Sequence, residues 1–311
     1  MKSIEVVGIG ANVHDTLLEV GAYPKEDTKL RAENRISCGG GPCATGLVAC
    51  SKLGAATAFI GNVSDDPSGR FLIDDFKRYG VETRYMTEKK GFDSFVSYVI
   101  LSRESTSRTI VFDKGNVPPL ELNGEQRAAV ADAKLLMVDG NDLDAAIDGA
   151  KTARENGTKV LYDAGGLYEG VERLLPFCDI IIPSEEFALG ITGKDSAEDA
   201  ARAIFERYSP DVVVVTCGKR GGVMCDGNGV LRYAAYKVDA VDSNGAGDVF
   251  HGAFAYAMTR GLDFMKACKF SSAVSALKCT KVGARAGVPD FASVIKFLKE
   301  HGENEFEENM E

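Results

Sequence analysis

The chain has 311 residues, of which 45% are hydrophobic and 26% are charged, and its formal net charge is −10. This composition is typical of a globular protein and excludes a disordered or collagen-like chain. Because an acidic chain is repelled by a phosphate backbone, we expect no nucleic-acid partner. Residues 302–311 contain five glutamates, which predict a solvated acidic tail.

The sequence contains no signal of membrane insertion or export. It has no apolar run of about 18 residues, and Glu5 interrupts the first apolar run, so a signal-peptide core is lacking. The eight cysteines include no C-x-x-C pair, and there are three histidines. This pattern favours a reducing compartment and disfavours a zinc site. We therefore expect a cytoplasmic protein with no membrane partner.

Short β-branched runs alternate along the chain with stretches of helical length. The predicted strands are residues 4–8, 57–60, 134–138, 159–162, 179–182 and 211–216, and the predicted helices are residues 42–53, 69–79, 143–156 and 196–208. Apolar strands that alternate with amphipathic helices indicate a parallel sheet covered on both faces. The sequence therefore predicts a doubly wound α/β fold.

Two segments, residues 16–37 and 92–113, interrupt this alternation because they lack a helical pattern. Residues 94–101 and 108–112 are predicted to be antiparallel strands. We interpret the two segments as a small β-sheet that forms a lid over a site. From residue 245 onward the chain is predicted to be mostly helical, and no linker separates independent domains, so residues 1–311 are predicted to form a single domain.

The sharpest motif is the segment Val241–Phe250, VDSNGAGDVF, which we expect to follow a strand and to open a long helix. The small residues Gly245, Ala246 and Gly247 let the backbone approach a ligand, and first-turn amides without helical partners suit a phosphate. The charge of Asp248 would repel a phosphate, which is unexpected in a simple phosphate-binding loop. Its position is explained if Asp248 accepts a proton from a hydroxyl that attacks the phosphate. The alternative is a helix start with an acidic residue favoured by the macrodipole.

Four segments, in order along the chain, resemble the ribokinase (PfkB) family of carbohydrate kinases. Asp242–Asp248 is similar to the D-T-x-G-A-G-D signature of the family, with Ser243 in place of Thr. Cys38–Gly54 is similar to the family's glycine pair and the small-residue helix after it. Gly61–Gly69 is similar to its G-x-V-G-x-D-x-x-G turn, and Val215–Gly222 to its nucleotide-side T-x-G-x-x-G. The resemblance covers nearly the whole chain and implies a ribokinase-like fold. Ser275–Asp290 resembles a subgroup that includes fructose-type and sulfofructose-type sugar kinases.

The resemblance implies a role for each matching residue. Asp248 would be the general base, and the amides of Gly245, Ala246 and Gly247 would stabilise charge on the transferring γ-phosphoryl group of ATP. The residues that would bind the sugar are Asp15, Gly40, Gly41 and Thr45, and those that would bind ATP are Ser184, Thr216, Gly218, Gly221 and Ser272.

The resemblance also implies two metal sites. A monovalent-cation site, which holds potassium in many relatives, would comprise Asp242, Asn244 and main-chain oxygens around Lys281, Gly283 and Gly287. The family's N-x-x-E motif, associated with magnesium, here reads Ser184-Glu185-Glu186-Phe187, with Ser for Asn and Phe for Glu. Either Glu185 or Glu186 would hold Mg²⁺ through water, or Ser184 caps a helix whose first turn carries both glutamates.

The segment Val7–Val13 begins like a dinucleotide-binding fingerprint, but no helical pattern follows it. In addition, Val13 stands where ribokinases proper usually have Asn, which argues against ribose as the substrate. His14 and Asp15 would point to opposite faces of a strand. His14 is therefore interpreted as a structural or rim residue.

Four other residues near the motifs allow two interpretations each. His251 lies about one helical turn after Asp248 and is interpreted as a packed bystander rather than a site residue. Asp163 follows an apolar strand, where it either supports the phosphate or metal region or acts as a cap. Lys29 and Arg108 either meet an acidic substituent under the lid or are solvated surface charges.

Together these inferences predict an ATP- and Mg²⁺-dependent kinase, with potassium as a further cofactor, that phosphorylates a primary hydroxyl of a sugar or sugar acid. The alternatives are a nucleoside kinase on the same fold, a catalytically silent sugar or nucleotide sensor and, more distantly, a dinucleotide-dependent oxidoreductase. Lids of this kind in the family often pair across a twofold axis, and an open sheet has edges to cover. We therefore expect a homodimer formed through the lid.

Overall fold

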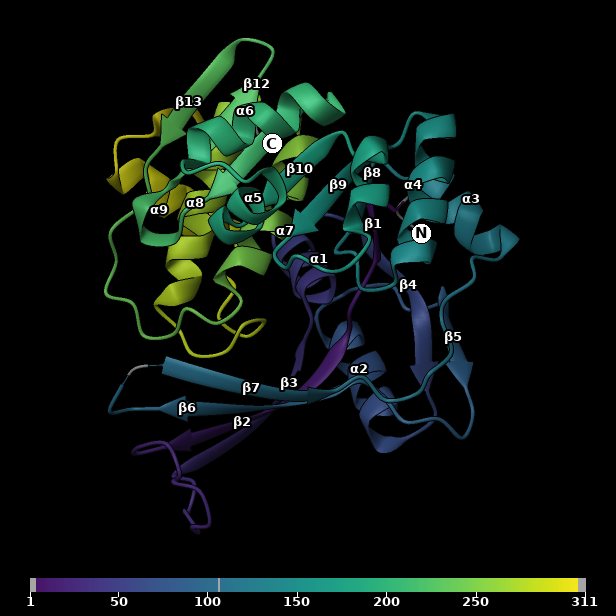
Figure 1. The fold of residues 1–311 in the computed structure, drawn as a ribbon, viewed down its shortest axis with the longest axis vertical. Coiled ribbons are helices and arrows are strands. Elements are labelled where there is room, and N and C mark those ends of the chain that lie inside the picture. The colour runs from purple at the N-terminus through teal and green to yellow at the C-terminus, as the bar shows by residue number, and fades with distance from the viewer. Residues whose placement is uncertain (1–3, 106, 307–311) are drawn as a thin grey trace.

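The structure is a computed structural model that describes residues 4–105 and 107–306. Its largest element is a nine-stranded sheet with the order β13-β12-β11-β10-β9-β8-β1-β4-β5 (Figure 1). The strands from β11 to β5 are parallel, and β12 and β13 extend one edge antiparallel. The bounds are β1 Val6–Ile9, β4 Thr57–Ser64, β5 Met86–Lys89, β8 Leu135–Val138, β9 Lys159–Ala164, β10 Ile180–Pro183, β11 Val212–Thr216, β12 Gly222–Asp226 and β13 Gly229–Tyr233.

Helices cover both faces of this sheet, and each face buries its own hydrophobic core. Neighbouring strand residues face opposite cores, so that Val6 of β1 belongs to one and Val7 to the other. The first core lies under α1 Pro42–Lys52, α2 Pro67–Arg78, α7 Ala246–Thr259, α8 Phe264–Cys279 and α9 Phe291–Glu300, and the second under α3 Gly124–Asp132, α4 Leu143–Asn156, α5 Glu185–Thr192 and α6 Ala197–Tyr208. The predicted doubly wound α/β class is confirmed.

A second sheet of four strands lies apart from the nine-stranded one, with the order β3-β2-β6-β7 (Figure 1). It is built from β2 Val13–Val20, β3 Asn34–Gly40, β6 Val96–Ser102 and β7 Ser107–Asp113. These strands come from the two segments that lacked a helical pattern in the sequence. The β6–β7 pair is antiparallel, as predicted, whereas β2 and β6 pair in parallel.

The order of the strands reverses at β1. The chain first adds β4 on one side of β1 and later adds β8, β9, β10 and β11 on the other. Open α/β sheets bind ligands beyond the carboxyl ends of their strands at such a switch point. Because β2 follows β1 after three residues, the four-stranded sheet starts at this edge.

Three local expectations differ from the structure. Residues 234–240, expected to contain a strand before the 242–248 motif, form neither helix nor strand. Part of the expected solvated tail packs instead, because Phe306 is buried and Glu303 lies 2.9 Å from Lys269; residues 307–311 of that tail lie outside the described residues. Residues 222–233, for which no strand was predicted, form the β12–β13 hairpin.

Among the described residues, no helix is long and apolar enough to cross a membrane. The same part of the chain contains no group of three or more histidine, cysteine, aspartate or glutamate side chains placed to hold a metal ion.

Candidate active site

A cavity of about 480 Å³, which we name the central cavity, lies between the carboxyl ends of the central strands, the start of α7 and the four-stranded sheet. It brings together every residue that the sequence assigned to catalysis or to sugar binding. These residues are Asp15, Gly40, Gly41, Thr45, Gly245, Ala246, Gly247 and Asp248. They come from segments more than 200 positions apart, so only the fold could place them in one cavity.

α7 begins at the wall of this cavity. Gly245 precedes the helix with φ of 73°, a left-handed conformation that favours glycine, and an added Cβ there would lie 2.5 Å from the Cβ of Ala284. The amide of Ala246 donates to the carbonyl of Ser243 at 3.2 Å. Among the described residues the amides of Gly245 and Gly247 have no acceptor, and such first-turn amides suit an anion.

Asp248 lies in the first turn of α7 and faces the cavity, while protein surrounds its other sides. This burial, together with the neighbouring carboxylate of Asp163, raises the pKa of Asp248 to about 7, and His251 acts in the opposite direction. A carboxyl group with a pKa near neutrality is matched to accepting a proton at neutral pH.

His251 also lines the cavity, one helical turn after Asp248. Its Nδ1 lies 3.0 Å from Oδ2 of Asp163 at the end of β9, and its Nε2 lies 3.0 Å from the carbonyl oxygen of Ile182. His251 is packed, as the sequence suggested, but the helical phase of α7 also turns it into the cavity wall beside Asp163. Asp163 contacts His251 instead of capping a helix.

Asp15 and the glycine pair meet where β2 and β3 enter the cavity. Ser97 on β6 donates a hydrogen bond of 2.6 Å to Asp15, and burial raises the pKa of Asp15 although that bond acts to lower it. An added Cβ at Gly40 would lie 2.0 Å from Oδ2 of Asp15, and one at Gly41, where φ is 92°, would lie 2.3 Å from the Ala11 carbonyl oxygen. Gly40 therefore leaves room for the carboxylate of Asp15, and Gly41 leaves room for the backbone at Ala11.

His14, next to Asp15 on β2, points the other way, as the alternation of a strand predicts. Its ring nitrogens lie within hydrogen-bond distance of the hydroxyls of Ser37 and Ser68, and its ring stacks on Phe71 with 4.3 Å between centroids. The structural interpretation of His14 is confirmed.

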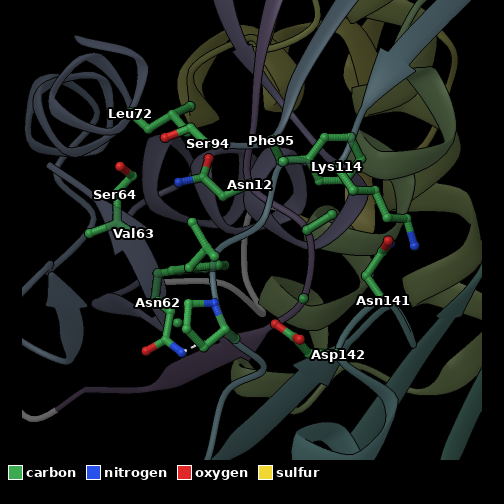
Figure 2. A pocket seen from close by; sticks show the side chains of 17 residues that line it. Asn12, Asn62, Val63, Ser64, Leu72, Ser94, Phe95, Lys114, Asn141 and Asp142 are labelled. Atoms are coloured by element: carbon green, nitrogen blue, oxygen red, sulfur yellow. Dashed lines mark hydrogen bonds between the residues drawn. The ribbon is translucent and has the colours of Figure 1, made fainter. Parts of the chain in front are cut away.

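A smaller cavity of about 210 Å³, the inner cavity, adjoins the central one (Figure 2). The two share Ala11, Phe95, Lys114 and Asn141. Figure 2 shows Lys114 and Asn141 on one side of it, opposite Asn62. Sequence reasoning missed Lys114 and Asn141; their only signal was that each closely follows the end of a strand.

Asp139, also missed, anchors the backbone beneath the central cavity. It is buried and accepts hydrogen bonds from the amides of Ala11, Cys43 and Asn141 at 2.8, 3.1 and 3.0 Å, and burial raises its pKa to about 6. An added Cβ at Gly10 would lie 2.4 Å from Asp139 Oδ1. Gly10, the second glycine of the G-x-G in Val7–Val13, thus makes room for a carboxylate, and a strand rather than a helix follows this segment.

A third cavity of about 580 Å³, the side cavity, lies between the β11–β12 turn, residues 233–240 and the helices α7 and α8. Four of the five residues predicted to bind ATP line it, namely Thr216, Gly218, Gly221 and Ser272. The fifth, Ser184, lines the central cavity instead. The central and side cavities share Thr216, Ser243, Ala246 and Gly247, so they meet at the start of α7.

The two glutamates considered for magnesium lie away from this junction. Ser184 caps α5 by accepting a hydrogen bond from the amide of Phe187 at 3.1 Å, as the helix-start alternative predicted. Glu185 forms an ion pair with Arg220, and Glu186 is exposed. Neither glutamate is among the described residues that line the central or side cavity, so these positions do not fit direct contact with a metal there.

The predicted monovalent-cation residues do come together. The carboxylate of Asp242 accepts hydrogen bonds of 2.8 Å from the amides of Asn244 and Gly283. An added Cβ at Gly287 would lie 2.7 Å from the carbonyl oxygen of Gly283 and 3.2 Å from that of Lys281. Gly287 thus leaves space among converging main-chain carbonyl oxygens, and such oxygens are suitable ligands for a monovalent cation.

A carboxyl group beside first-turn amides, at a point where two cavities meet, suits phosphoryl transfer, and the chain was compared with known proteins. Residues 1–290 match the pfkB family carbohydrate kinases. The chain is 27% identical to ribokinase from Haemophilus influenzae over 307 residues, covering 96% of this chain and 99% of the relative. It is 26% identical to 5-dehydro-2-deoxygluconokinase from Clostridium perfringens over 286 residues, covering 85% of each.

A solved structure from Agrobacterium tumefaciens, assigned as a ribokinase, superposes with a TM-score of 0.91 at 28% identity and covers 97% of this chain and 99% of its own. The chain therefore belongs to the pfkB family of carbohydrate kinases. It is an ATP-dependent phosphotransferase that acts on a sugar.

Proposed function

We propose that the enzyme transfers the γ-phosphoryl group of ATP to a primary hydroxyl of a sugar or sugar acid bound in the central cavity. The observation that carries this proposal is the junction of the two cavities at the start of α7. A nucleotide in the side cavity would direct its phosphates to this junction, and an acceptor beside Asp15 would meet them there. Asp248 lies on the acceptor side, where a general base is needed.

In the proposed reaction the hydroxyl oxygen of the sugar bonds to the γ-phosphorus while its O–H bond breaks. The proton passes to the carboxylate of Asp248, and the bond from the γ-phosphorus to the β–γ bridging oxygen breaks to release ADP. The amides of Gly245 and Gly247 stabilise the charge on the transferring group. Magnesium bound to ATP would supply charge neutralisation, and Glu185 and Glu186 would not contact it directly, since neither lines the cavities.

The lining of the central cavity supports an acceptor with an acidic group. Arg108 on β7 and Lys114 directly after it line the cavity, and neither has an ion-pair partner among the described residues. Lys29, the other cation considered from the sequence, lies outside the lining residues. A sugar carboxylate would supply the missing counter-charge to Arg108 or Lys114.

The same lining argues against a nucleoside acceptor. Phe95 and Phe112 supply aromatic surface, but Asp15, Arg108 and Lys114 make the cavity strongly charged, whereas a nucleoside base favours an apolar, aromatic pocket. The alternative of a silent sensor is disfavoured by Asp248, because binding alone needs no base. No observation favours a dinucleotide cofactor, since β2 replaces the helix that its fingerprint requires.

An ADP-release assay tests the proposal, with ATP and Mg²⁺ against hexoses, pentoses, ketoses, sugar acids, inositols and nucleosides. The Asp248→Asn protein, which keeps the size of the side chain but cannot accept the proton, serves as the blank. We expect a signal with a sugar or sugar acid that falls by about 10²-fold or more in Asp248→Asn, the range of general base catalysis, while ATP binding measured by calorimetry stays within twofold. A variant that keeps most of its kcat would refute the assignment of Asp248.

A further inference from the structure

A buried imidazole–carboxylate pair lies in the wall of the central cavity, next to the proposed base. His251 on α7 and Asp163 on β9 place Nδ1 and Oδ2 3.0 Å apart, and their side chains are 4% and 1% exposed. The other ring nitrogen, Nε2, lies 3.0 Å from the carbonyl oxygen of Ile182. Both residues line the same cavity as Asp248.

The partners of His251 determine where its protons are. A carbonyl oxygen can only accept, so Nε2 must carry a hydrogen to donate to Ile182. Nδ1 lies 3.0 Å from Oδ2 of Asp163, and neither atom has hydrogen-bond geometry with any described residue. At this distance the carboxylate favours a protonated Nδ1 by charge attraction, because the lone pair of an unprotonated Nδ1 would add to the negative potential of the carboxylate. With that proton the pair holds one more proton than a neutral imidazole with a carboxylate, and its net charge is zero.

Electrostatics place that proton on the imidazole. Burial lowers the pKa of His251, but the charge of Asp163 and the contact with it outweigh burial, and Asp248 adds to them, so that the pKa of His251 is raised overall. The 3.0 Å contact with Asp163 and the charge of Asp248 therefore favour the imidazolium form of His251.

Most charges near Asp248 are negative and raise its pKa, so the positive charge of His251 opposes them. Asp163 on β9, Asp139 after β8 and Asp15 on β2 all face Asp248 and raise its pKa. Tyr168, after β9, is neutral at neutral pH because burial and the carboxylates of Asp139, Asp163 and Asp248 raise its pKa. Further cations near the cavity are Lys278 on α8, the exposed Arg108 and Lys114, and the buried Arg285, which donates a hydrogen bond of 2.6 Å to the carbonyl oxygen of Gly40.

We propose that His251, held as an imidazolium by Asp163, is a positioning residue that keeps Asp248 ionised and therefore able to accept the proton of the acceptor. This inference rests on the proposed function for its catalytic consequence, but the proton count and the charge on Asp248 are properties of the protein alone. The ionisation of Asp248 then depends on the net charge of the Asp163–His251 pair.

Substitutions at the two positions separate this idea from a packing role. His251→Asn places a side-chain amide near the former position of Nδ1 but leaves the charge of Asp163 uncompensated, so the net charge of the pair becomes −1. Asp163→Asn lets His251 become neutral, and the double variant contains two amides, so both pairs stay at zero. We expect the pKa of Asp248 to rise by about one unit or more in His251→Asn, the usual effect of a nearby charge, and to return close to the wild-type value in the double variant.

The pKa of Asp248 is measured from its carboxyl ¹³C resonance, assigned by its loss in Asp248→Asn. In parallel, ¹⁵N-histidine labelling reports both ring nitrogens of His251, which is assignable because the chain has three histidines. The expected result is two protonated nitrogens at pH 7 in wild type. The exposed His301 on the far end of α9 provides the control His301→Asn, which should leave the Asp248 resonance unchanged.

The catalytic consequence is tested by the acid limb of kcat/KM. Because only ionised Asp248 accepts a proton, activity rises with pH through its pKa, and a raised pKa moves the limb to higher pH. We expect about a tenfold loss for His251→Asn one unit below neutrality, reversed in the double variant. A packing role predicts instead that the double variant is at least as impaired as His251→Asn.

A neutral His251, or an Asp248 resonance that titrates at the same pH in wild type and His251→Asn, overturns the inference. Neither result touches the proposed function, which fails separately if wild type phosphorylates no acceptor while the resonances behave as expected.

Discussion

The ammonium group of Lys278 lies 2.7 Å from the main-chain oxygen of Asp242 and 3.6 Å from its carboxylate oxygen Oδ2. Lys278 is fully buried on α8. Burial lowers the pKa of Lys278, and Asp242 acts to raise it. The carboxylate that the family resemblance assigned to a potassium site thus already has a cation of the protein beside it.

We therefore expect the kinase to depend little on potassium. Replacing K⁺ by a large organic cation at constant ionic strength should change kcat/KM by less than about twofold, because Lys278 already compensates the charge of Asp242. In Lys278→Met, which keeps the length of the side chain but removes its charge, Asp242 and the nearby oxygens need another cation. Activation by K⁺ of about tenfold is then expected, the effect of roughly 1.4 kcal/mol.

The matched control for this experiment is Lys296→Met on α9, an exposed lysine whose loss should leave the ion dependence unchanged. A wild-type enzyme that loses most of its activity without potassium would contradict the prediction, and the oxygens around Gly287 would then be the place to look for the ion.

The contact between Gly40 and Asp15 gives a second prediction. In Gly40→Ala the added Cβ would meet Oδ2 of Asp15 at 2.0 Å and displace the carboxylate from its hydrogen bond with Ser97. We expect the KM for the sugar to rise by about tenfold or more, the loss of one charge-assisted hydrogen bond, while the Kd for ATP stays within twofold because Gly40 does not line the side cavity.

Gly124→Ala, at the start of α3, is the control for this substitution, since an added Cβ there meets nothing within 4 Å. An unchanged sugar KM in Gly40→Ala would mean that Asp15 does not bind the acceptor.

Most strands and helices and the glycine motifs of the central cavity could be predicted from the sequence, because each is determined by a pattern of a few neighbouring residues. The sequence did not predict pairs that depend on how separate elements meet. Asp163 and His251 are 88 positions apart, and their contact is set by the helical phase of α7 against β9. Asp242 and Lys278 meet only because α8 packs along α7. Asp139 has no signature at all, since two of the three amides from which it accepts hydrogen bonds, those of Ala11 and Cys43, belong to distant segments.

Arg108 and Lys114 of the central cavity, which have no ion-pair partner in the described part of the chain, predict a preference between acceptors. Arg108→Gln and Lys114→Gln should each raise the KM for a sugar acid by about tenfold, the contribution of a charge-assisted hydrogen bond, and alter the KM for the matching neutral sugar by less than twofold. Both values come from steady-state kinetics with a sugar acid and its alcohol analogue. Arg103→Gln is the control, because Arg103, directly after β6, pairs with Glu33 at 2.7 Å and does not line the cavity. Equal effects on both acceptors would rule out an acidic group as the partner of these cations.

The outer face of the four-stranded sheet carries the last prediction, the homodimer. Tyr98 on β6 and Val111 on β7 are paired across the strands and are 52% and 60% exposed. Apolar side chains on the outer face of an open sheet favour burial against a second copy.

We therefore expect sedimentation velocity at micromolar concentration to show a dimer for wild type and a monomer for Tyr98→Lys combined with Val111→Lys, since two facing lysines would have to be buried in each copy. Leu231→Lys is the matched control. Leu231 is as exposed as Tyr98, at 52%, but it lies on β13, an edge strand of the nine-stranded sheet. A wild-type monomer would show that the two apolar side chains serve another purpose. A dimer that persists in the double variant would place the interface elsewhere, with the chemistry of the central cavity unaffected in either case.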